Sequence, residues 1–96
     1  MSGNVTLLSE EEITTALATL RGWTRSGASI TRTVELADFR EAMLYTGAVA
    51  YLAEVANHHP DILIQWNRVE LTLSTHSEGG LTAADRALAG QINARR

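Results

Sequence analysis

Apolar residues recur at helical spacing near the start of the chain, directly after a capping pattern. Ser9 and Glu12 form a capping box, because the Ser9 hydroxyl can accept a backbone N–H bond and the Glu12 side chain can reach back. The apolar positions that follow fit one face of a helix: Ile13, Ala16, Leu17 and Leu20. The pattern predicts a helix from about Glu10 to Thr19, with Gly22 as its stop signal.

A β-hairpin is predicted after this helix. Gly27 separates two short runs, residues 23–25 and 29–36, and the second run is rich in β-branched residues. Both runs are short enough to be strands joined by a tight turn.

A long helix is predicted in the middle of the chain. Asp38 and Glu41 form a second capping box, and the helix should last about twenty residues. Pro60 disfavours the helical conformation at His59, so the helix should end at about His58. Its small side chains would let another helix approach closely, although packing on a sheet would explain them equally. The expected apolar face comprises Phe39, Ala42, Met43, Thr46, Val49, Ala50, Ala53 and Ala56.

A second hairpin and a last helix complete the pattern. Apolar and polar residues alternate over residues 62–67 and again over 69–76, which predicts two strands joined near Asn67 and Arg68. The two-residue period puts His76 at the strand end, on its polar side. A third capping box, Thr82 with Asp85, then opens a helix whose apolar side is Leu81, Leu88, Ala89 and Ile92.

Composition indicates one small domain over residues 1–96. The chain has 45% hydrophobic and 20% charged residues with no shift along its length, and no cysteine. The missing cysteine removes thiolate chemistry and fits a cytoplasmic protein, the default expectation. A domain this short without disulfides must gain stability from good packing or from subunit contacts, and we expect a homo-oligomer.

Charge and hydropathy exclude two classes of partner. The net charge of −3 comes without any cluster of Lys and Arg, so direct nucleic-acid binding is not expected. The longest apolar stretch, residues 48–53, is far below the roughly 20 residues of a membrane span. The N-terminus also lacks a signal pattern, so no membrane association is expected.

The three histidines are the candidate chemistry. His58, His59 and His76 lie within 19 positions of one another, on a predicted helix end and a predicted strand end. Imidazole both donates and accepts protons near neutral pH, so a converging set favours general acid–base catalysis. The alternative is structural, because histidine near a helix C-terminus is stabilised by the macrodipole.

A metal site is a weaker alternative for these histidines. Glu54, Asp61 or Glu78 could add a carboxylate ligand. The adjacent imidazoles of His58 and His59, however, diverge too much for an easy chelating pair, whereas ligands at i and i+4 share a helix face. The spacing therefore does not favour zinc.

Four other residues could have a structural rather than a functional role: two acidic residues and two tryptophans. Asp85 caps a helix whatever else it does, so a structural role is preferred there. Glu54 lies four residues before His58 and either orients its imidazole or forms a solvated pair. Trp23 and Trp66 are expected in the core or at an interface.

No phosphate loop, dinucleotide fingerprint, nucleophile elbow or HExxH metal motif occurs in the sequence.

Together these motifs resemble the pterin-4a-carbinolamine dehydratases. The matching runs are EVANHHPD at residues 54–61, WNRV at 66–69, STH at 74–76 and GLT at 80–82 followed by Asp85. The resemblance extends over about four-fifths of the chain, from LSEEE at residues 8–12 to DRALA at 85–89. Trp66, Leu36 and Arg21 depart from the residues usual in the family, and none of them is a proton-transfer group.

The resemblance implies an α+β fold with a four-stranded antiparallel sheet and three helices on one face, in the order α-β-β-α-β-β-α. It implies dimers through sheet edges and often tetramers through the long helix. The implied reaction is loss of water from a 4a-hydroxytetrahydropterin, in tetrahydrobiopterin recycling, without a metal or other cofactor. His58 and His76 would form the acid–base pair, and His59 would hold or polarise the pterin. Glu54 would orient His58, and substrate-binding roles fall to Glu54, Asn57, Asp61, Ser74, Thr75 and Asp85.

A protein-binding module is the main competing function. The family includes dimerisation partners of a transcription factor and degenerate relatives that act as assembly factors. The three retained histidines favour the enzyme, because a scaffold has no evident need for them. A metal-dependent hydrolase is the weakest option.

Overall fold

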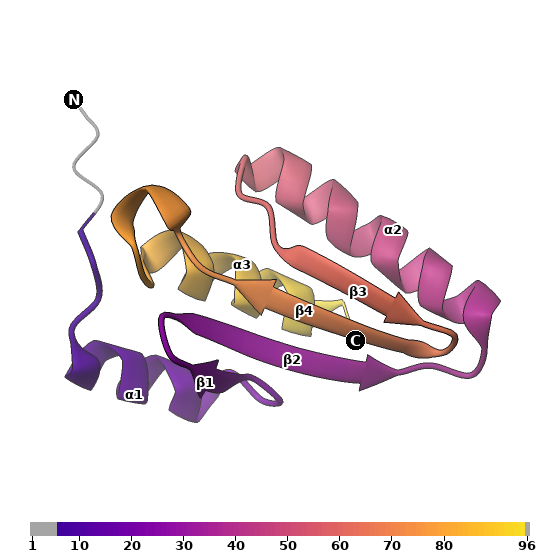
Figure 1. Ribbon diagram of the computed structural model, residues 1–96, viewed down its shortest axis with the longest axis horizontal. Coiled ribbons are helices and arrows are strands. Elements are labelled where there is room, and N and C mark those ends of the chain that lie inside the picture. The colour runs from indigo at the N-terminus through magenta and orange to yellow at the C-terminus, as the bar shows by residue number, and fades with distance from the viewer. Residues whose placement is uncertain (1–5, 96) are drawn as a thin grey trace.

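The computed structural model describes residues 6–95 and has the expected order of helices and strands. Its four strands form one antiparallel sheet in the order β1-β2-β4-β3, with β2 and β4 at the centre (Figure 1). The fold class predicted from the sequence is therefore confirmed. The elements are α1 (Glu10–Thr19), β1 (Thr24–Ser26), β2 (Ser29–Glu35), α2 (Phe39–Ala56), β3 (Asp61–Gln65), β4 (Arg68–Leu73), the 3-10 turn η1 (His76–Glu78) and α3 (Ala83–Ala94).

One face of the sheet carries the core. Val69, Leu71 and Leu73 are fully buried while the residues between them are not, as the two-residue period of a strand requires. Residues from all three helices join the same buried cluster, so the helices cover this one face. α3 passes behind β4, and α2 runs beside β3, one of the two edge strands (Figure 1).

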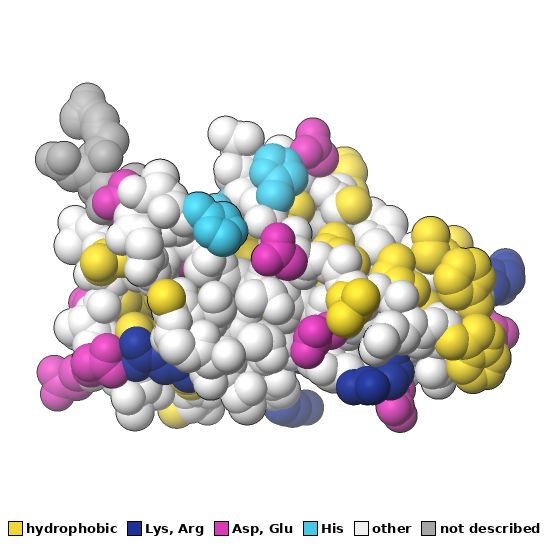
Figure 2. Space-filling model, in the orientation of Figure 1, with side chains coloured by type: hydrophobic (Ala, Val, Ile, Leu, Met, Phe, Trp, Pro, Cys, Tyr) yellow, Lys and Arg dark blue, Asp and Glu magenta, His cyan; other side chains and the backbone are white. Residues whose placement is uncertain are grey.

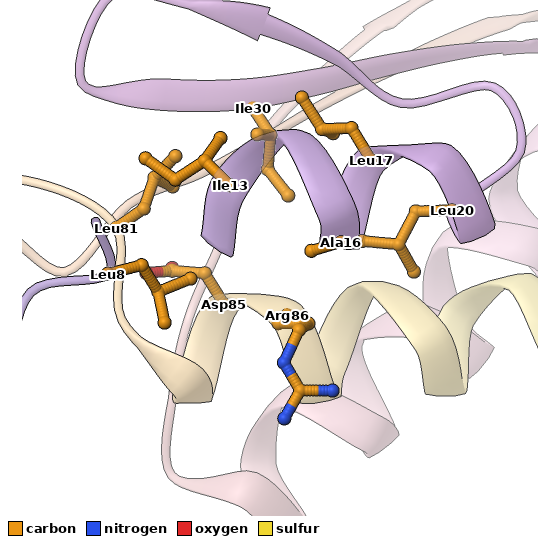
Figure 3. A pocket seen from close by; sticks show the side chains of 9 residues that line it. All are labelled: Leu8, Ile13, Ala16, Leu17, Leu20, Ile30, Leu81, Asp85 and Arg86. Carbon is orange, nitrogen blue, oxygen red and sulfur yellow. The ribbon is translucent and has the colours of Figure 1, made fainter. Parts of the chain in front are cut away.

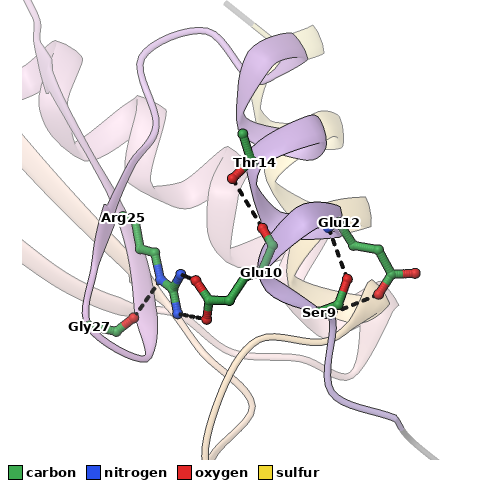
Figure 4. A network of polar contacts seen from close by, with 6 residues as sticks. All are labelled: Ser9, Glu10, Glu12, Thr14, Arg25 and Gly27. Atoms are coloured by element: carbon green, nitrogen blue, oxygen red, sulfur yellow. Dashed lines mark hydrogen bonds and ion pairs between the residues drawn. The ribbon is translucent and has the colours of Figure 1, made fainter.

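The capping patterns largely formed as expected. Both sides of the capping box are present at α1, where Ser9 and Glu12 bond each other's backbone N–H (Figure 4), and at α3, where Thr82 and Asp85 do the same. At α2, Asp38 accepts the N–H of Glu41 at 2.9 Å. The Glu41 carboxylate instead accepts a hydrogen bond from Arg40, so only half of the predicted box was found.

Two elements near the histidines end earlier than predicted. α2 ends at Ala56 rather than His58, because Asn57 takes the left-handed conformation with a φ of 51°. Asparagine is one of the few residues that accept this conformation at a helix C-terminus. β4 ends at Leu73, and His76 lies in the 3-10 turn after it, closed by Gly79 with a φ of 72°. The prediction of a strand reaching His76 was therefore wrong.

The apolar face of α2 is divided between core and surface. Ala42, Val49 and Ala53 are buried as expected, together with Tyr45. The expected face was too broad, since Phe39, Met43, Ala50 and Ala56 are exposed. We use the name outer apolar face of α2 for its exposed large hydrophobic residues: Phe39, Met43, Leu44, Tyr51 and Val55.

The two tryptophans have different environments. Trp23 lies in the core, and its indole N–H donates to Asn93 Oδ1 at 2.9 Å. Trp66 is 65% exposed and has a φ of 50° in the turn between β3 and β4. Of the two places expected for Trp66, the core is excluded, and the interface with another molecule stays a prediction. No helix in residues 6–95 is both long and apolar enough to cross a membrane.

Candidate active site

The structure brings the three histidines to one cleft. His58 and His59 come from the loop after α2, and His76 comes from the turn after β4. The cleft measures about 250 Å³, near the lower end of small-molecule sites. In Figure 2 histidine and acidic side chains lie close together on one face of the molecule. Seven residues line the cleft: Asn57, His58, His59, Ser74, Thr75, His76 and Ser77.

His58 is paired with a buried carboxylate. Its Nε2 lies 2.6 Å from Asp85 Oδ1, and the two side chains are 14% and 1% exposed. A short, nearly dry contact of this kind fixes the plane of the ring, because no water competes for the same atoms. Asp85 therefore orients His58 as well as capping α3.

The second oxygen of Asp85 is held from the opposite side. Asp85 Oδ2 accepts the backbone N–H of Thr82 at 2.8 Å and the hydroxyl of Thr75 at 2.7 Å. The Thr75 and Thr82 hydroxyls lie 2.8 Å apart. The cap of α3, the residue after β4 and the loop after α2 are thus joined through one carboxylate.

Glu54 contacts a different histidine from the one expected. Its Oε2 lies 2.6 Å from Nε2 of His59, and both side chains are largely exposed, at 74% and 56%. The expectation that Glu54 orients His58 was wrong, because it assumed a helix that continues to residue 58. The left-handed Asn57 ends the helix first, so His58 is no longer on the face of Glu54.

The remaining predicted site residues lie at different distances from the cleft. Asn57, Ser74 and Thr75 line it, while Glu54 and Asp85 reach it through His59 and His58. Asp61 is exposed at the start of β3 and is not among the lining residues. Sequence reasoning missed Ser77, which carried no signal, and the Thr82 hydroxyl, which had been assigned only to the helix cap.

Other hollows of the molecule lack this chemistry. The apolar cavity between α1 and α3 has a volume of about 10 Å³, room for at most one water, and Asp85 lies at its border (Figure 3). Two larger grooves, of about 610 and 630 Å³, are lined by no histidine. Within residues 6–95, no three His, Cys, Asp or Glu side chains are arranged to hold a metal ion.

Known proteins with similar sequences and folds carry the same family name. A protein of Nocardia farcinica named pterin-4-alpha-carbinolamine dehydratase is 55% identical over 91% of this chain and 92% of its own length. A protein of the same name from Roseiflexus castenholzii is 51% identical over 91% and 94%. The crystal structure of a transcriptional coactivator/pterin dehydratase from Brucella melitensis superimposes with a TM-score of 0.89 at 38% identity, covering 93% and 97% of the two chains.

A more distant structure shares only the fold. It is a pterin dehydratase-like protein described as a RuBisCO assembly factor in the alpha-carboxysome, with a TM-score of 0.62 and 22% identity. It covers 75% of this chain and 83% of its own. The sequence model of the family Pterin 4 alpha carbinolamine dehydratase matches residues 6–95, almost the whole chain. This protein belongs to the pterin-4a-carbinolamine dehydratase family.

Proposed function

We propose that this protein dehydrates a 4a-hydroxytetrahydropterin to the quinonoid dihydropterin by histidine acid–base catalysis. The observation that carries the proposal is the cleft lined by three imidazoles, two of which are bonded to carboxylates. The relatives named as dehydratases support the substrate class. The route served is recycling of tetrahydrobiopterin, and the setting is the cytoplasm.

The reaction needs two proton transfers and no change in oxidation state. A base removes the proton on ring N5, and that electron pair forms the double bond between N5 and C4a. The C4a–O bond breaks, and an acid protonates the departing hydroxyl so that it leaves as water. Positioned imidazoles perform both steps at neutral pH.

His58 and His76 are the proposed acid–base pair. His58 has the more fixed ring, because Asp85 bonds it in a nearly dry setting. His76 lies across the cleft on a separate element and is exposed to the solvent from which protons are exchanged. The exposed pair of His59 and Glu54 is suited to holding the polar edge of the pterin.

The proposed assembly is a homodimer or homotetramer. The outer apolar face of α2 leaves Leu44, Tyr51 and Val55 between 57% and 69% exposed in the single chain. Contiguous exposed apolar residues of this size mark contact surfaces. Strand β3 is also an open edge of the sheet, to which another strand can add.

A protein-binding role is the second candidate function, and the same exposed face of α2 favours it. The Brucella melitensis structure is described as a transcriptional coactivator as well as a pterin dehydratase. A stopped-flow assay of 4a-carbinolamine decay, with and without the purified protein, separates the two. Acceleration supports the enzyme, whereas an unchanged rate would leave the binding role.

A further inference from the structure

The hydroxyl groups of Thr75 and Thr82 form a chain that ends on Asp85. Thr75 Oγ1 lies 2.7 Å from Asp85 Oδ2 and 2.8 Å from Thr82 Oγ1. Thr82 Oγ1 is farther from the carboxylate, at 3.5 Å, and accepts the N–H of Ala84 at 3.3 Å. Thr82 and Asp85 are 0% and 1% exposed, so solvent does not offer these atoms other partners.

The number of protons fixes the direction of this chain. Each hydroxyl has one proton to donate, and an ionised carboxylate only accepts. Because Thr75 makes the shorter contact with Asp85, its proton goes to Oδ2. Thr75 then accepts the proton of Thr82, which has no closer acceptor among the described residues. The donors therefore run from Thr82 to Thr75 to Asp85.

The same count of donors and acceptors indicates which ring nitrogen of His58 carries the proton. Thr82 N–H and Thr75 O–H occupy Oδ2, which leaves Oδ1 to His58 at 2.6 Å. An ionised Asp85 has no proton to donate at Oδ1, so the inference places the hydrogen of this bond on Nε2 of His58. In the neutral ring Nδ1 is then the nitrogen with a free lone pair.

We infer that Thr75 is a positioning residue for His58: its hydroxyl holds Asp85 so that His58 keeps its Nε2–H form and transfers protons through Nδ1. This inference rests on the proposed function for its catalytic meaning, but not for the state of the ring. His59 offers an internal comparison, because its Glu54 partner is 74% exposed and has no such support. Its ring state should not depend on Thr75.

Nitrogen-15 NMR of the histidine rings tests the inference directly in the free protein. Recorded at a pH where the histidine rings are neutral, the wild-type spectrum should show the His58 proton on Nε2, bonded to a carboxylate. Thr75→Val keeps the shape and removes the hydroxyl that holds Oδ2, so the carboxylate is free to turn away from the ring and no longer enforces the Nε2–H form. It should give a mixture of the two ring forms at His58 and no change at His59. A wild-type spectrum with the His58 proton on Nδ1 would overturn the inference without any variant.

Steady-state kinetics supply the second readout. Thr75→Val should lower kcat by about 10–100-fold with little change in KM. Losses of this size are typical when an outer hydrogen-bond partner that orients a functional histidine is removed. Thr75→Ser restores the hydroxyl and should restore both the ring state and kcat. The matched control is Thr72→Val, on β4 and half-buried but outside the cleft, which should leave both unchanged.

The outcomes distinguish this inference from the proposed function. If Thr75→Val keeps His58 wholly in the Nε2–H form, or Thr75→Ser fails to restore it, the positioning role is wrong. If the wild-type protein does not accelerate carbinolamine decay while the NMR results hold, the proposed function fails and the hydroxyl chain stands.

Discussion

Replacing Asp85 separates its role in folding from its role in orienting His58. Asp85→Asn keeps the size of the side chain but turns one acceptor oxygen into an NH₂ donor. Thr82 N–H and Thr75 O–H both need an acceptor, so the amide oxygen should take the place of Oδ2. The NH₂ group then faces His58 Nε2 and forces the ring proton to Nδ1.

The structure sets the size of both effects. Asp85→Asn keeps two of the three hydrogen bonds as neutral ones, so the free energy of unfolding should fall by only about 1–3 kcal/mol. Asp85→Ala leaves Thr82 N–H and His58 Nε2 without their partner in a nearly dry site, at about 1–3 kcal/mol each, while Thr75 O–H can turn to Thr82 Oγ1. Its loss of about 2–6 kcal/mol exceeds the roughly 0.5–2 kcal/mol expected for a helix cap alone.

The asparagine variant should lose most of its activity although it keeps most of its stability. A wrong ring form at an acid–base histidine costs up to about 10⁴-fold in kcat while the geometry is retained. Asp85→Asn should therefore stay folded, about 1–3 kcal/mol less stable than the wild type. It should lose about 10²–10⁴-fold in turnover, the range for a positioned acid or base. Denaturant unfolding and stopped-flow absorbance measure the two quantities.

Asp38→Asn is the matched control, since Asp38 caps α2 away from the cleft and asparagine caps a helix equally well. It should change neither stability nor turnover. If Asp85→Asn turns over carbinolamine at the wild-type rate, Asp85 does not act through the ring state of His58. If Asp85→Ala unfolds as readily as Asp85→Asn, the buried donors do not depend on the carboxylate as described.

Three further changes test other parts of the molecule. The added methyl group of Gly47→Ala meets nothing within 4 Å in the single chain. It would stabilise an isolated helix by about 0.5–1 kcal/mol. If another subunit packs against Gly47, the variant should instead assemble more weakly in sedimentation. A higher melting temperature with unchanged assembly, or a wild-type mass of 10.4 kDa by light scattering, would contradict the proposed contact. His59→Ala should raise KM with little change in kcat, and the reverse pattern would make His59 a proton-transfer residue. The hydrogen bond from Arg25 and the positive charge of its guanidinium lower the pKa of Glu10 from 4.5 (Figure 4). The Glu10–Arg25 pair therefore contributes stability above the pKa of Glu10 in the unfolded chain, and this contribution is lost as pH falls through the pKa of Glu10 in the folded protein. The difference in unfolding free energy between wild type and Glu10→Gln should thus be largest at neutral pH and vanish in acid, and a constant difference would contradict it.

The fold was predictable because its signals are local. Capping pairs three residues apart mark the starts of α1 and α3, and apolar spacing separates helices from strands without any knowledge of tertiary contacts. The exposed side of α2 was less predictable. Its apolar residues look like core residues in sequence, and only the packed sheet shows which of them it covers.

The candidate site was predictable in its residues but not in their pairing. Sequence spacing suggested that Glu54 would bond His58. Because Asn57 takes the left-handed conformation and ends the helix, His58 instead bonds Asp85, and Glu54 bonds His59. That contact joins positions 27 residues apart, as the contact of Thr75 with Asp85 joins positions 10 apart. Such pairs depend on how β4 and α3 meet, which no local pattern records.

Stopped-flow decay of 4a-carbinolamine tests the central claim most directly, with the wild type, His58→Ala, His76→Ala and the double variant side by side. The wild type should accelerate decay, and each single change should lower turnover by roughly 10²–10⁴-fold in a folded protein. The double change should cost less than the product of the two, because groups that serve one transition state act as a unit. A double variant that folds and keeps near-wild-type turnover, or a wild type that does not accelerate decay at all, would contradict histidine acid–base catalysis by this protein.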